Sequence, residues 1–237
     1  MKKYFSMFVG LILAIGIDLF GSLNPENVKT EGFDLGQLFR HYGSDKDVNG
    51  YTSIYHVLFD HRKKQPIKLL EIGIGTMIPN AHSSMVGYAG KNYKPGGSLR
   101  AWRDYFIRGD IHGVDVQADT QFSDEPRITT HLCDSTSKNA VAEFMKNLNG
   151  MKFDIIVDDG SHIVSNQIKT LANFYPYLND NGLYIIEDIY PESPLSRKPR
   201  LLSAICNGDP YFFVGVKNNI CIIFKNHLNR NSDKYKY

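Results

Sequence analysis

The stretch Leu69-Leu70-Glu71-Ile72-Gly73-Ile74-Gly75-Thr76 decides the fold that we predict for this chain of 237 residues. An apolar run that ends on two closely spaced glycines indicates a buried strand followed by a sharp turn that a ligand can approach. In open α/β sheets, ligands bind in the crevice at the carboxyl ends of the strands. A dinucleotide fingerprint needs a third glycine where this chain has Ile78. The stretch therefore predicts the seat of a nucleoside without a pyrophosphate, and an ordinary tight turn is the alternative.

Segments with strand-like and helix-like patterns alternate around this stretch. Short apolar runs predict strands at residues 67–72, 111–116, 127–132, 153–157 and 182–186. Apolar residues at helical spacing predict helices at residues 33–41, 51–64, 99–106, 140–148 and 163–178. Continuous apolar strands separated by helices indicate a parallel sheet with helices on both faces.

The C-terminal part of the chain breaks this alternation. Residues 211–216 and 220–224 are two further predicted strands, with only Lys217-Asn218-Asn219 between them. A parallel pair needs a crossover of about a dozen residues or more, so this pair is predicted to be an antiparallel hairpin. We expect a Rossmann-like α/β fold with a mostly parallel, seven-stranded sheet that ends in this hairpin. Such a sheet resembles that of class I methyltransferases more than that of a dinucleotide-binding domain.

The composition is that of an ordinary globular protein, with 42% hydrophobic and 22% charged residues. A net charge of +2 without a dense Lys/Arg stripe argues against a nucleic-acid partner. The scattered cysteines Cys133, Cys206 and Cys221 form no CxxC pair, so they indicate neither a zinc site nor a disulfide framework.

The N-terminal segment, residues 1–24, is apolar and is followed by a predicted helical cap at residues 25–65. Lys2 and Lys3 precede an apolar run at residues 4–20. A basic start followed by an apolar stretch is typical of a signal peptide, but a clean cleavage site is lacking. The run is short for a bilayer core, which needs roughly 20 apolar residues. We expect a helix that lies on a membrane surface or packs on a partner, and a signal sequence or an anchor is the alternative.

Two aspartates follow the second and third predicted strands. Asp115 is placed to accept hydrogen bonds from ribose hydroxyls, and a solvated strand-end aspartate is the alternative. Asp134, in Cys133-Asp134-Ser135-Thr136, is placed to meet an adenine amino group. Its alternative is a helix N-cap, because a helix is predicted to begin near Ser137.

Acidic residues also follow the fourth and fifth predicted strands. They lie in Val157-Asp158-Asp159-Gly160-Ser161-His162 and in Glu187-Asp188. Neighbouring parallel strands bring both groups to one rim, where converging carboxylates repel one another unless a cation lies between them. Oxygen ligands suit a hard ion such as Mg²⁺, and His162 can serve as a base near neutral pH. The alternative is that Asp158 and Asp188 cap helices and that His162 is a loop residue.

Together these motifs resemble the metal-dependent class I O-methyltransferases that act on macrolide sugars in mycinamicin and tylosin biosynthesis. The matching stretches run from Tyr42 to Asp188. They are Tyr42-Gly43-Ser44-Asp45-Lys46, Gly50-Tyr51-Thr52, Leu69-Leu70-Glu71-Ile72-Gly73, residues 96–106, Ile111-His112-Gly113-Val114-Asp115, residues 153–162, and Tyr184-Ile185-Ile186-Glu187-Asp188.

The resemblance implies that residues 66–225 are an S-adenosylmethionine-dependent methyltransferase domain, followed by a polar tail at residues 226–237. It implies His162 as the base and Mg²⁺ held by Asp159, Glu187 and Asp188. It implies a binding site for S-adenosylmethionine that is lined by Tyr51, Thr52, Glu71, Gly73, Gly75, Ser98, Asp115, Asp134, Ser135 and Asp158. The macrolide enzymes carry a further N-terminal domain that helps to build the acceptor pocket, so the identity of the acceptor does not carry over.

The expected reaction is transfer of a methyl group to a hydroxyl of a sugar or of a glycosylated small molecule. A catechol-like or other small hydroxyl compound is an alternative acceptor, and a non-catalytic, membrane-associated scaffold is an alternative function. Because the methyl donor is a cytoplasmic metabolite, we expect a cytoplasmic protein, with membrane-surface association through residues 4–20 as an option. Homo-oligomerisation stays open.

Overall fold

The computed structural model describes residues 33–81, 84–89, 93–190, 193, 205–206, 210–215 and 219–225. The predictions for residues 1–24 and for the tail at 226–237 lie outside these described residues. The chain divides into two units, Met1–Asp34 and Leu35–Tyr237, and all the elements below belong to the second unit. Among the described residues, no helix is long and apolar enough to cross a membrane.

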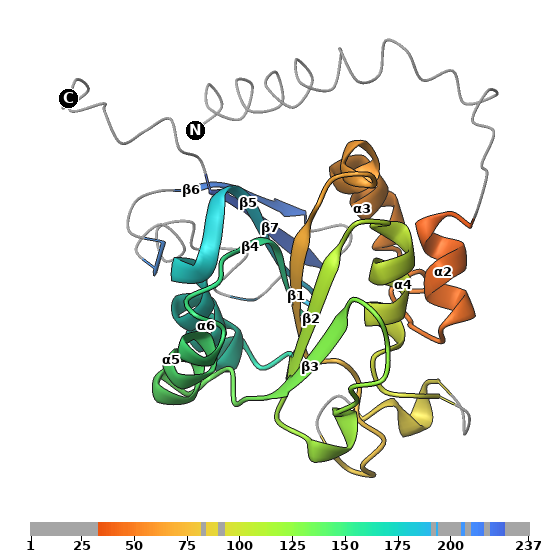
Figure 1. Ribbon diagram of the computed structural model, residues 1–237, viewed down its shortest axis with the longest axis horizontal. Coiled ribbons are helices and arrows are strands. Elements are labelled where there is room, and N and C mark those ends of the chain that lie inside the picture. Colours follow the sequence, from red (N-terminus) through yellow and green to blue (C-terminus); the bar gives the residue numbers. More distant parts are fainter. Residues whose placement is uncertain are drawn as a thin grey trace. The chain divides into compact units, whose positions relative to one another are not determined.

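The strands form one sheet in the order β3-β2-β1-β4-β5-β7-β6 (Figure 1). Pairing is parallel from β3 to β5, whereas β7 pairs antiparallel with both β5 and β6. The bounds are β1 Lys68–Ile72, β2 Asp110–Asp115, β3 Ile128–Leu132, β4 Phe153–Asp158, β5 Leu178–Ile186, β6 Pro210–Gly215 and β7 Ile220–Lys225. This arrangement confirms the predicted mostly parallel sheet with an antiparallel end.

Helices cover both faces of the sheet, as Figure 1 shows. One face carries α2 (Leu35–His41), α3 (Thr52–Phe59) and α4 (Gly97–Tyr105), and the other carries α5 (Lys138–Asn147) and α6 (Val164–Phe174). Short 3-10 helices are η1 (Asp60–Arg62), η2 (Met85–Gly87), η3 (Ala118–Thr120) and η4 (Tyr175–Tyr177).

The core has two layers because successive strand residues point to opposite faces of the sheet. Leu69 belongs to the layer under α2, α3 and α4, which contains Trp102, whereas the next residue, Leu70, belongs to the layer with Phe174. Each fully buried side chain of this size contributes roughly 1.5–3 kcal/mol relative to exposure. This packing fixes the positions of the strand ends.

Two predicted helices are shorter in the structure. The helix predicted at residues 51–64 ends at Phe59 and continues as η1. The helix predicted at residues 163–178 ends at Phe174, because Pro176 cannot continue an α-helix and lies within η4 instead. The strand predicted at residues 182–186 begins earlier, since Leu178 already pairs with Phe153.

Candidate active site

The carboxyl ends of β1, β4 and β5 are level with one another. Ile72 pairs with Asp158, and Asp158 pairs with Ile186, so the next residue in each chain segment emerges at the same rim. Strand alternation then separates two neighbours: Asp159 contacts Lys46 from the α2–α3 loop, whereas Asp158 lines a cavity beside α6. The rim at the carboxyl ends of these strands therefore has two halves. One half, under α2–α4, is here called the acidic cluster and consists of Lys46, Glu71, Asp159, His162, Glu187 and Asp188. The other half is a cavity beside α6.

Asp159, His162 and Asp188 form the part of the acidic cluster that can hold a metal ion. His162 Nε2 lies 3.1 Å from Asp159 Oδ1 and 3.2 Å from Asp188 Oδ2. One ligand atom from each residue lies within 4.8 Å of the others. His162 and Asp188 both have left-handed backbone, with φ of 56° and 54°, which is uncommon for residues other than glycine. Such local strain is typical of functional sites.

The charges in this cluster shift one another's proton affinities. Burial by itself lowers the pKa of His162, but the hydrogen bond and charge of Asp159, together with the charge of Asp188, raise it overall. Burial raises the pKa of Asp188, and the positive charge of His162 opposes the rise. The imidazole therefore carries a proton most readily when both carboxylates are ionised.

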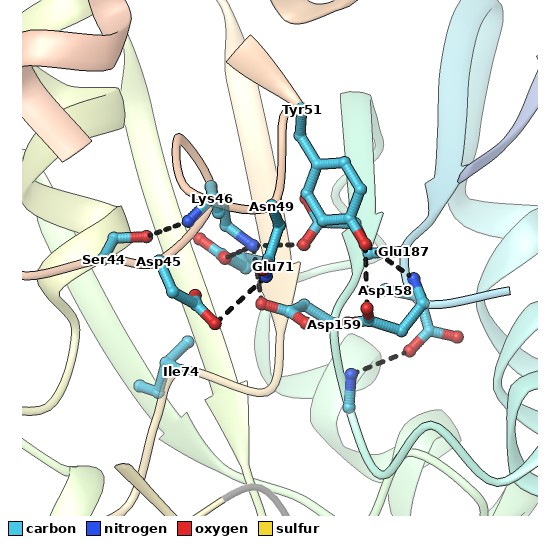
Figure 2. A network of polar contacts seen from close by, with 12 residues as sticks. Ser44, Asp45, Lys46, Asn49, Tyr51, Glu71, Ile74, Asp158, Asp159 and Glu187 are labelled. Atoms are coloured by element: carbon cyan, nitrogen blue, oxygen red, sulfur yellow. Dashed lines mark hydrogen bonds and ion pairs between the residues drawn. The ribbon is translucent and has the colours of Figure 1, made fainter. Parts of the chain in front are cut away.

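Glu187, the third carboxylate predicted to hold a metal, is buried behind this group. Its Oε2 accepts a hydrogen bond of 2.6 Å from Lys46 Nζ, and its Oε1 accepts one from the hydroxyl of Tyr55. Figure 2 shows Lys46 pointing in among Glu71, Asp159 and Glu187. Burial raises the pKa of Glu187, and Lys46 opposes the rise.

Two of the predicted cofactor-site residues, Tyr51 and Thr52, lie at the start of α3, on the acidic side of the rim. The hydroxyl of Tyr51 donates a hydrogen bond of 2.8 Å to Asp188 Oδ1 and accepts one from the Asp188 backbone N–H. The buried Oγ1 of Thr52 has no hydrogen-bond partner within the described part of the chain. Neither residue is among those that line the cavity beside α6.

Glu71 and Ser98 are also buried on the acidic side. Glu71 Oε1 lies 3.0 Å from Lys46 Nζ, and Glu71 Oε2 accepts a hydrogen bond of 3.0 Å from Trp102 Nε1. Burial raises the pKa of Glu71, while Lys46 and a hydrogen bond from Ser98 lower it. These contacts make Glu71 a link between the strand end, α4 and the α2–α3 loop.

The second half of the rim is a cavity of about 220 Å³, here called the rim cavity. Its lining includes five of the ten predicted cofactor-site residues: Gly73, Asp115, Asp134, Ser135 and Asp158. Asp115 lies between β1 and β2, where its carboxylate accepts hydrogen bonds from the backbone N–H groups of Ile74 and Gln117, at 3.0 and 2.9 Å. These bonds fix the glycine-rich turn against the end of β2.

Asp134 and Asp158 are not helix caps. Ser137 caps α5 by accepting a hydrogen bond from Ala140, whereas Asp134 accepts bonds from the backbone and hydroxyl of Thr136. Asp158 is buried, its Oδ2 has no partner among the described residues, and burial raises its pKa to about 7. An unpartnered buried oxygen at a cavity wall suits a ligand that donates a hydrogen bond there.

Packing within the protein itself requires glycine at both Gly73 and Gly75, in the turn that follows β1. Gly73 has φ of 81°, and a side chain there would overlap the carbonyl of Asp159. Gly75 has φ of 79°, and a side chain there would overlap the hydroxyl of Tyr93. Gly73 therefore brings the β1 turn against the β4 turn that carries the acidic cluster.

The sequence did not predict three residues that contribute to this site: Lys46, Tyr55 and Trp102. Lys46 lies in a polar turn where a lysine is ordinarily solvated, and Tyr55 and Trp102 lie on apolar helix faces where core packing is the ordinary expectation. The only available signal was that Lys46 and Trp102 fall within stretches that carry the family resemblance.

The donor set fits a hard divalent cation. Asp159 Oδ1 and the Asp188 carboxylate offer oxygen atoms to a cation on one side of the rim, and the imidazole of His162 lies between them. The rim cavity offers carboxylates and small polar groups next to this cluster. The arrangement can therefore hold a nucleoside-like ligand beside a metal ion and a proton acceptor.

Comparison with known proteins identifies relatives, although no protein-family model matches the chain. It is 35% identical over 156 residues to the 8-demethyl-8-alpha-L-rhamnosyl tetracenomycin-C 2'-O-methyltransferase of Streptomyces olivaceus, covering 65% of this chain and 37% of that protein. It is 33% identical over 159 residues to the demethylmacrocin O-methyltransferase of Streptomyces fradiae, covering 66% and 36%. It is 34% identical over 161 residues to the mycinamicin VI 2''-O-methyltransferase of Micromonospora griseorubida, with the same coverage. The chain thus spans little more than a third of these relatives' length.

Solved structures show the same fold. The MycE methyltransferase from the mycinamycin biosynthetic pathway, in complex with Mg, SAH and mycinamycin VI, aligns with a TM-score of 0.64 at 25% identity. The alignment covers 88% of this chain and 58% of that one. These findings confirm the class I methyltransferase fold and the resemblance to macrolide-sugar O-methyltransferases.

Proposed function

Starting from this similarity, we propose that the chain is an S-adenosylmethionine-dependent, Mg²⁺-assisted O-methyltransferase that acts on a hydroxyl of a sugar or of a glycosylated small molecule. One observation carries the proposal: the cluster of Asp159, His162 and Asp188 adjoins the rim cavity, with Asp158 and Asp159 adjacent in the chain. The named activities of the relatives, all O-methyltransferases of sugar-bearing compounds, support the choice of acceptor.

The rim cavity is the proposed seat of the methyl donor. Asp115 would accept hydrogen bonds from the ribose, and Asp134 with Ser135 would meet the adenine. Asp158, with its unpartnered Oδ2, offers a further acceptor to a donor group of the ligand. Tyr51, Thr52, Glu71, Gly75 and Ser98 stay predictions, because they lie outside the cavity lining.

Asp159 and Asp188 are the proposed ligands of the metal. Glu187 stays a predicted third ligand, since both of its oxygens are hydrogen bonded to Lys46 and Tyr55. Asp159 and Asp188 would hold a divalent ion, which would supply the positive charge that lowers the pKa of an acceptor hydroxyl.

His162 is the proposed base. Its imidazole takes the hydroxyl proton while the acceptor oxygen forms a bond to the methyl carbon and the carbon–sulfur bond of the donor breaks, which leaves S-adenosylhomocysteine. A hard ion prefers oxygen ligands, which leaves the imidazole free for this task. Alignment of oxygen, carbon and sulfur can supply roughly 7–11 kcal/mol at best.

A labelled-methyl transfer assay tests the proposal. The full chain would be incubated with labelled S-adenosylmethionine and a panel of glycosides with vicinal hydroxyls, glycolipids and catechols, with Mg²⁺ or with excess EDTA. We expect transfer to a glycoside that depends on Mg²⁺. Transfer to catechol alone would show that the acceptor is a catechol and not a sugar. Full activity in EDTA would show that the reaction needs no metal.

His162→Gln provides a second test of the same proposal. We expect it to bind S-adenosylhomocysteine as the unaltered chain does and to lose at least about 100-fold in turnover, the usual range for a general base. Unchanged turnover would assign the proton transfer to another group.

Three finer expectations belong to the same proposal. Membrane-surface association through residues 4–20 would be seen as cosedimentation with vesicles that is lost when these residues are removed. Homo-oligomerisation would be seen as a sedimentation coefficient above that of a single chain of 26.9 kDa. A cytoplasmic location follows from the need for the methyl donor.

A further inference from the structure

Lys46 is an almost completely buried lysine at the centre of the acidic cluster, with 1% of its side chain exposed. Its Nζ lies 2.6 Å from Asp159 Oδ2, 2.6 Å from Glu187 Oε2 and 3.0 Å from Glu71 Oε1 (Figure 2). These three carboxylates come from the ends of β4, β5 and β1. One ammonium group therefore connects three strands at the rim.

The loop that carries Lys46 is held in place independently of the strands. The Lys46 carbonyl accepts a hydrogen bond of 3.0 Å from Tyr51 N–H, and Asn49 N–H donates one of 2.9 Å to the Asp45 carbonyl. Tyr51 then begins the α3 region, where its hydroxyl reaches Asp188. The same short segment thus contacts the acidic residues of both β4 and β5.

The two oxygens of the Asp159 carboxylate have different partners. Oδ2 is bonded to Lys46, and Oδ1 faces His162 Nε2 at 3.1 Å. A carboxylate held at one oxygen cannot rotate freely, so its other oxygen is presented in a fixed direction. Residues that orient metal ligands in this way commonly change metal affinity 10–100-fold when they are lost.

Lys46 is also the counter-charge of the cluster. Burial alone lowers the pKa of a lysine, but Asp159, Glu187 and Glu71 outweigh it and hold the pKa of Lys46 well above its usual value. A buried charge without a partner is strongly unfavourable, so these carboxylates depend on the ammonium as much as it depends on them.

We propose that Lys46 is a positioning residue, whose ammonium group holds Asp159 and Glu187 so that Asp159 Oδ1 and the Asp188 carboxylate form a ready-made site for one divalent cation beside His162. The inference rests on the proposed function, because it assigns a purpose to the same site. It differs from the view that Lys46 merely occupies the cation's place until a metal arrives.

These two views predict opposite changes when the ammonium is removed. A positioning residue strengthens metal binding, so its loss weakens binding. A competing cation weakens metal binding, so its loss strengthens binding. The sign of the change therefore decides between them.

The experiment compares the metal affinity of Lys46→Met, Lys46→Arg and the unaltered chain. The probe is Mg²⁺ or Mn²⁺ alone, followed by calorimetry and by the fluorescence of Trp102, the single tryptophan, whose Nε1 is bonded to Glu71. S-adenosylhomocysteine binding and the unfolding temperature are measured on the same samples. Lys225→Met is the matched control, because Lys225 is a buried lysine bonded to the Leu178 carbonyl, away from this site.

We expect Lys46→Met to weaken metal binding about 10–100-fold and to leave S-adenosylhomocysteine binding within about two-fold. Lys46→Arg should recover part of the metal affinity, since it restores the positive charge. Lys225→Met should lower the unfolding temperature without changing metal affinity.

Unchanged or tighter metal binding by Lys46→Met would overturn the positioning role. If Lys46→Met does not fold, Lys46→Gln, which keeps a hydrogen-bond donor without the charge, takes its place. Weaker metal binding by Lys46→Gln with intact S-adenosylhomocysteine binding would support the positioning role, and unchanged or tighter metal binding would overturn it. Failure of the unaltered chain to bind either metal would overturn the proposed function itself, and this inference with it.

Discussion

The acidic cluster and the rim cavity lie at the same end of the sheet but hold their carboxylates in different ways. In the rim cavity, Asp115 is held by backbone N–H groups and Asp134 by the hydroxyl and backbone of a residue two positions later. In the acidic cluster, Asp159 and Glu187 are held by Lys46, a side chain 113 and 141 residues away in sequence.

This difference fits the tasks that we propose for the two halves. Carboxylates that are fixed by the backbone keep their positions when α2, α3 or the loop between them is altered. This suits recognition of a polar nucleoside. Carboxylates fixed by buried side chains share charge with their partners, which suits metal binding and proton transfer. The first half should tolerate changes in the cap, and the second half should not.

The largest effect that we expect comes from Asp159→Asn, which tests whether the two halves act independently. The change removes a proposed metal ligand and the partner of both Lys46 and His162, so metal-dependent transfer should fall at least about 100-fold. S-adenosylhomocysteine affinity, measured by calorimetry, should change by no more than a few-fold. A parallel loss of both would show that the halves form a single unit.

The second effect concerns Gly73, where the two halves touch. Gly73→Ala combines a left-handed backbone with an overlap onto the Asp159 carbonyl, so it should cost roughly 2–3 kcal/mol of stability. For a chain of this size, this corresponds to a fall of about 5–10 °C in Tm by calorimetry. Gly150→Ala is the control, because Gly150 is also left-handed, with φ of 68°, but has open space around it. Equal falls in Tm for the two variants would show that backbone strain, and not the overlap with the Asp159 carbonyl, causes the whole effect.

The third effect should be confined to the rim cavity. Asp115→Asn replaces one acceptor oxygen by a donor that faces a backbone N–H, so S-adenosylhomocysteine affinity should fall about 10–30-fold. Metal affinity, read from Trp102 fluorescence, should stay within about two-fold. An equal loss of metal affinity would contradict the separation of the two halves.

The smallest effect comes from outside both halves and concerns pH. His131, on β3, contacts His112 at 3.1 Å; burial, and then His112, lowers the pKa of His131 to about 4. Since the folded pKa lies below the unfolded value of about 6.5, the neutral imidazole stabilises the fold above that pH. This stability is lost as the pH falls from about 6.5 towards 4.

Thermal melts at pH 7 and pH 5 check this prediction with His131→Gln. The variant cannot gain the proton, so its Tm should fall less than that of the unaltered chain between the two pH values, by about 2–4 °C for about 1 kcal/mol after solvent screening. Identical pH dependence would assign the acid sensitivity to other groups. Metal and S-adenosylhomocysteine affinities at pH 7 should be unchanged.

Much of the fold could be predicted because its signals are local. The apolar run before Gly73, the alternation with helices and the short connection before the final strand each follow from a few neighbouring residues. Element ends were less accurate, as at Phe174, where a proline two residues later decides the boundary.

The candidate site was predictable where strand topology alone brings residues together. Asp159 and His162 follow β4, and Asp188 follows β5, the neighbouring parallel strand, so their proximity follows from the order of the strands. The same reasoning placed Asp115 beside the turn after β1.

The sequence by itself determined the α/β fold, the rim at the carboxyl ends of the strands and the acidic residues that gather there, because periodicity and parallel pairing act over short distances. Only the tertiary structure decided that Glu187 faces Lys46 and Tyr55, that Tyr51 reaches Asp188, and that the rim has two separate halves. These contacts join segments more than a hundred residues apart. Their formation depends on how α2, α3 and the loop between them pack on the sheet, and no local pattern in the sequence encodes that packing.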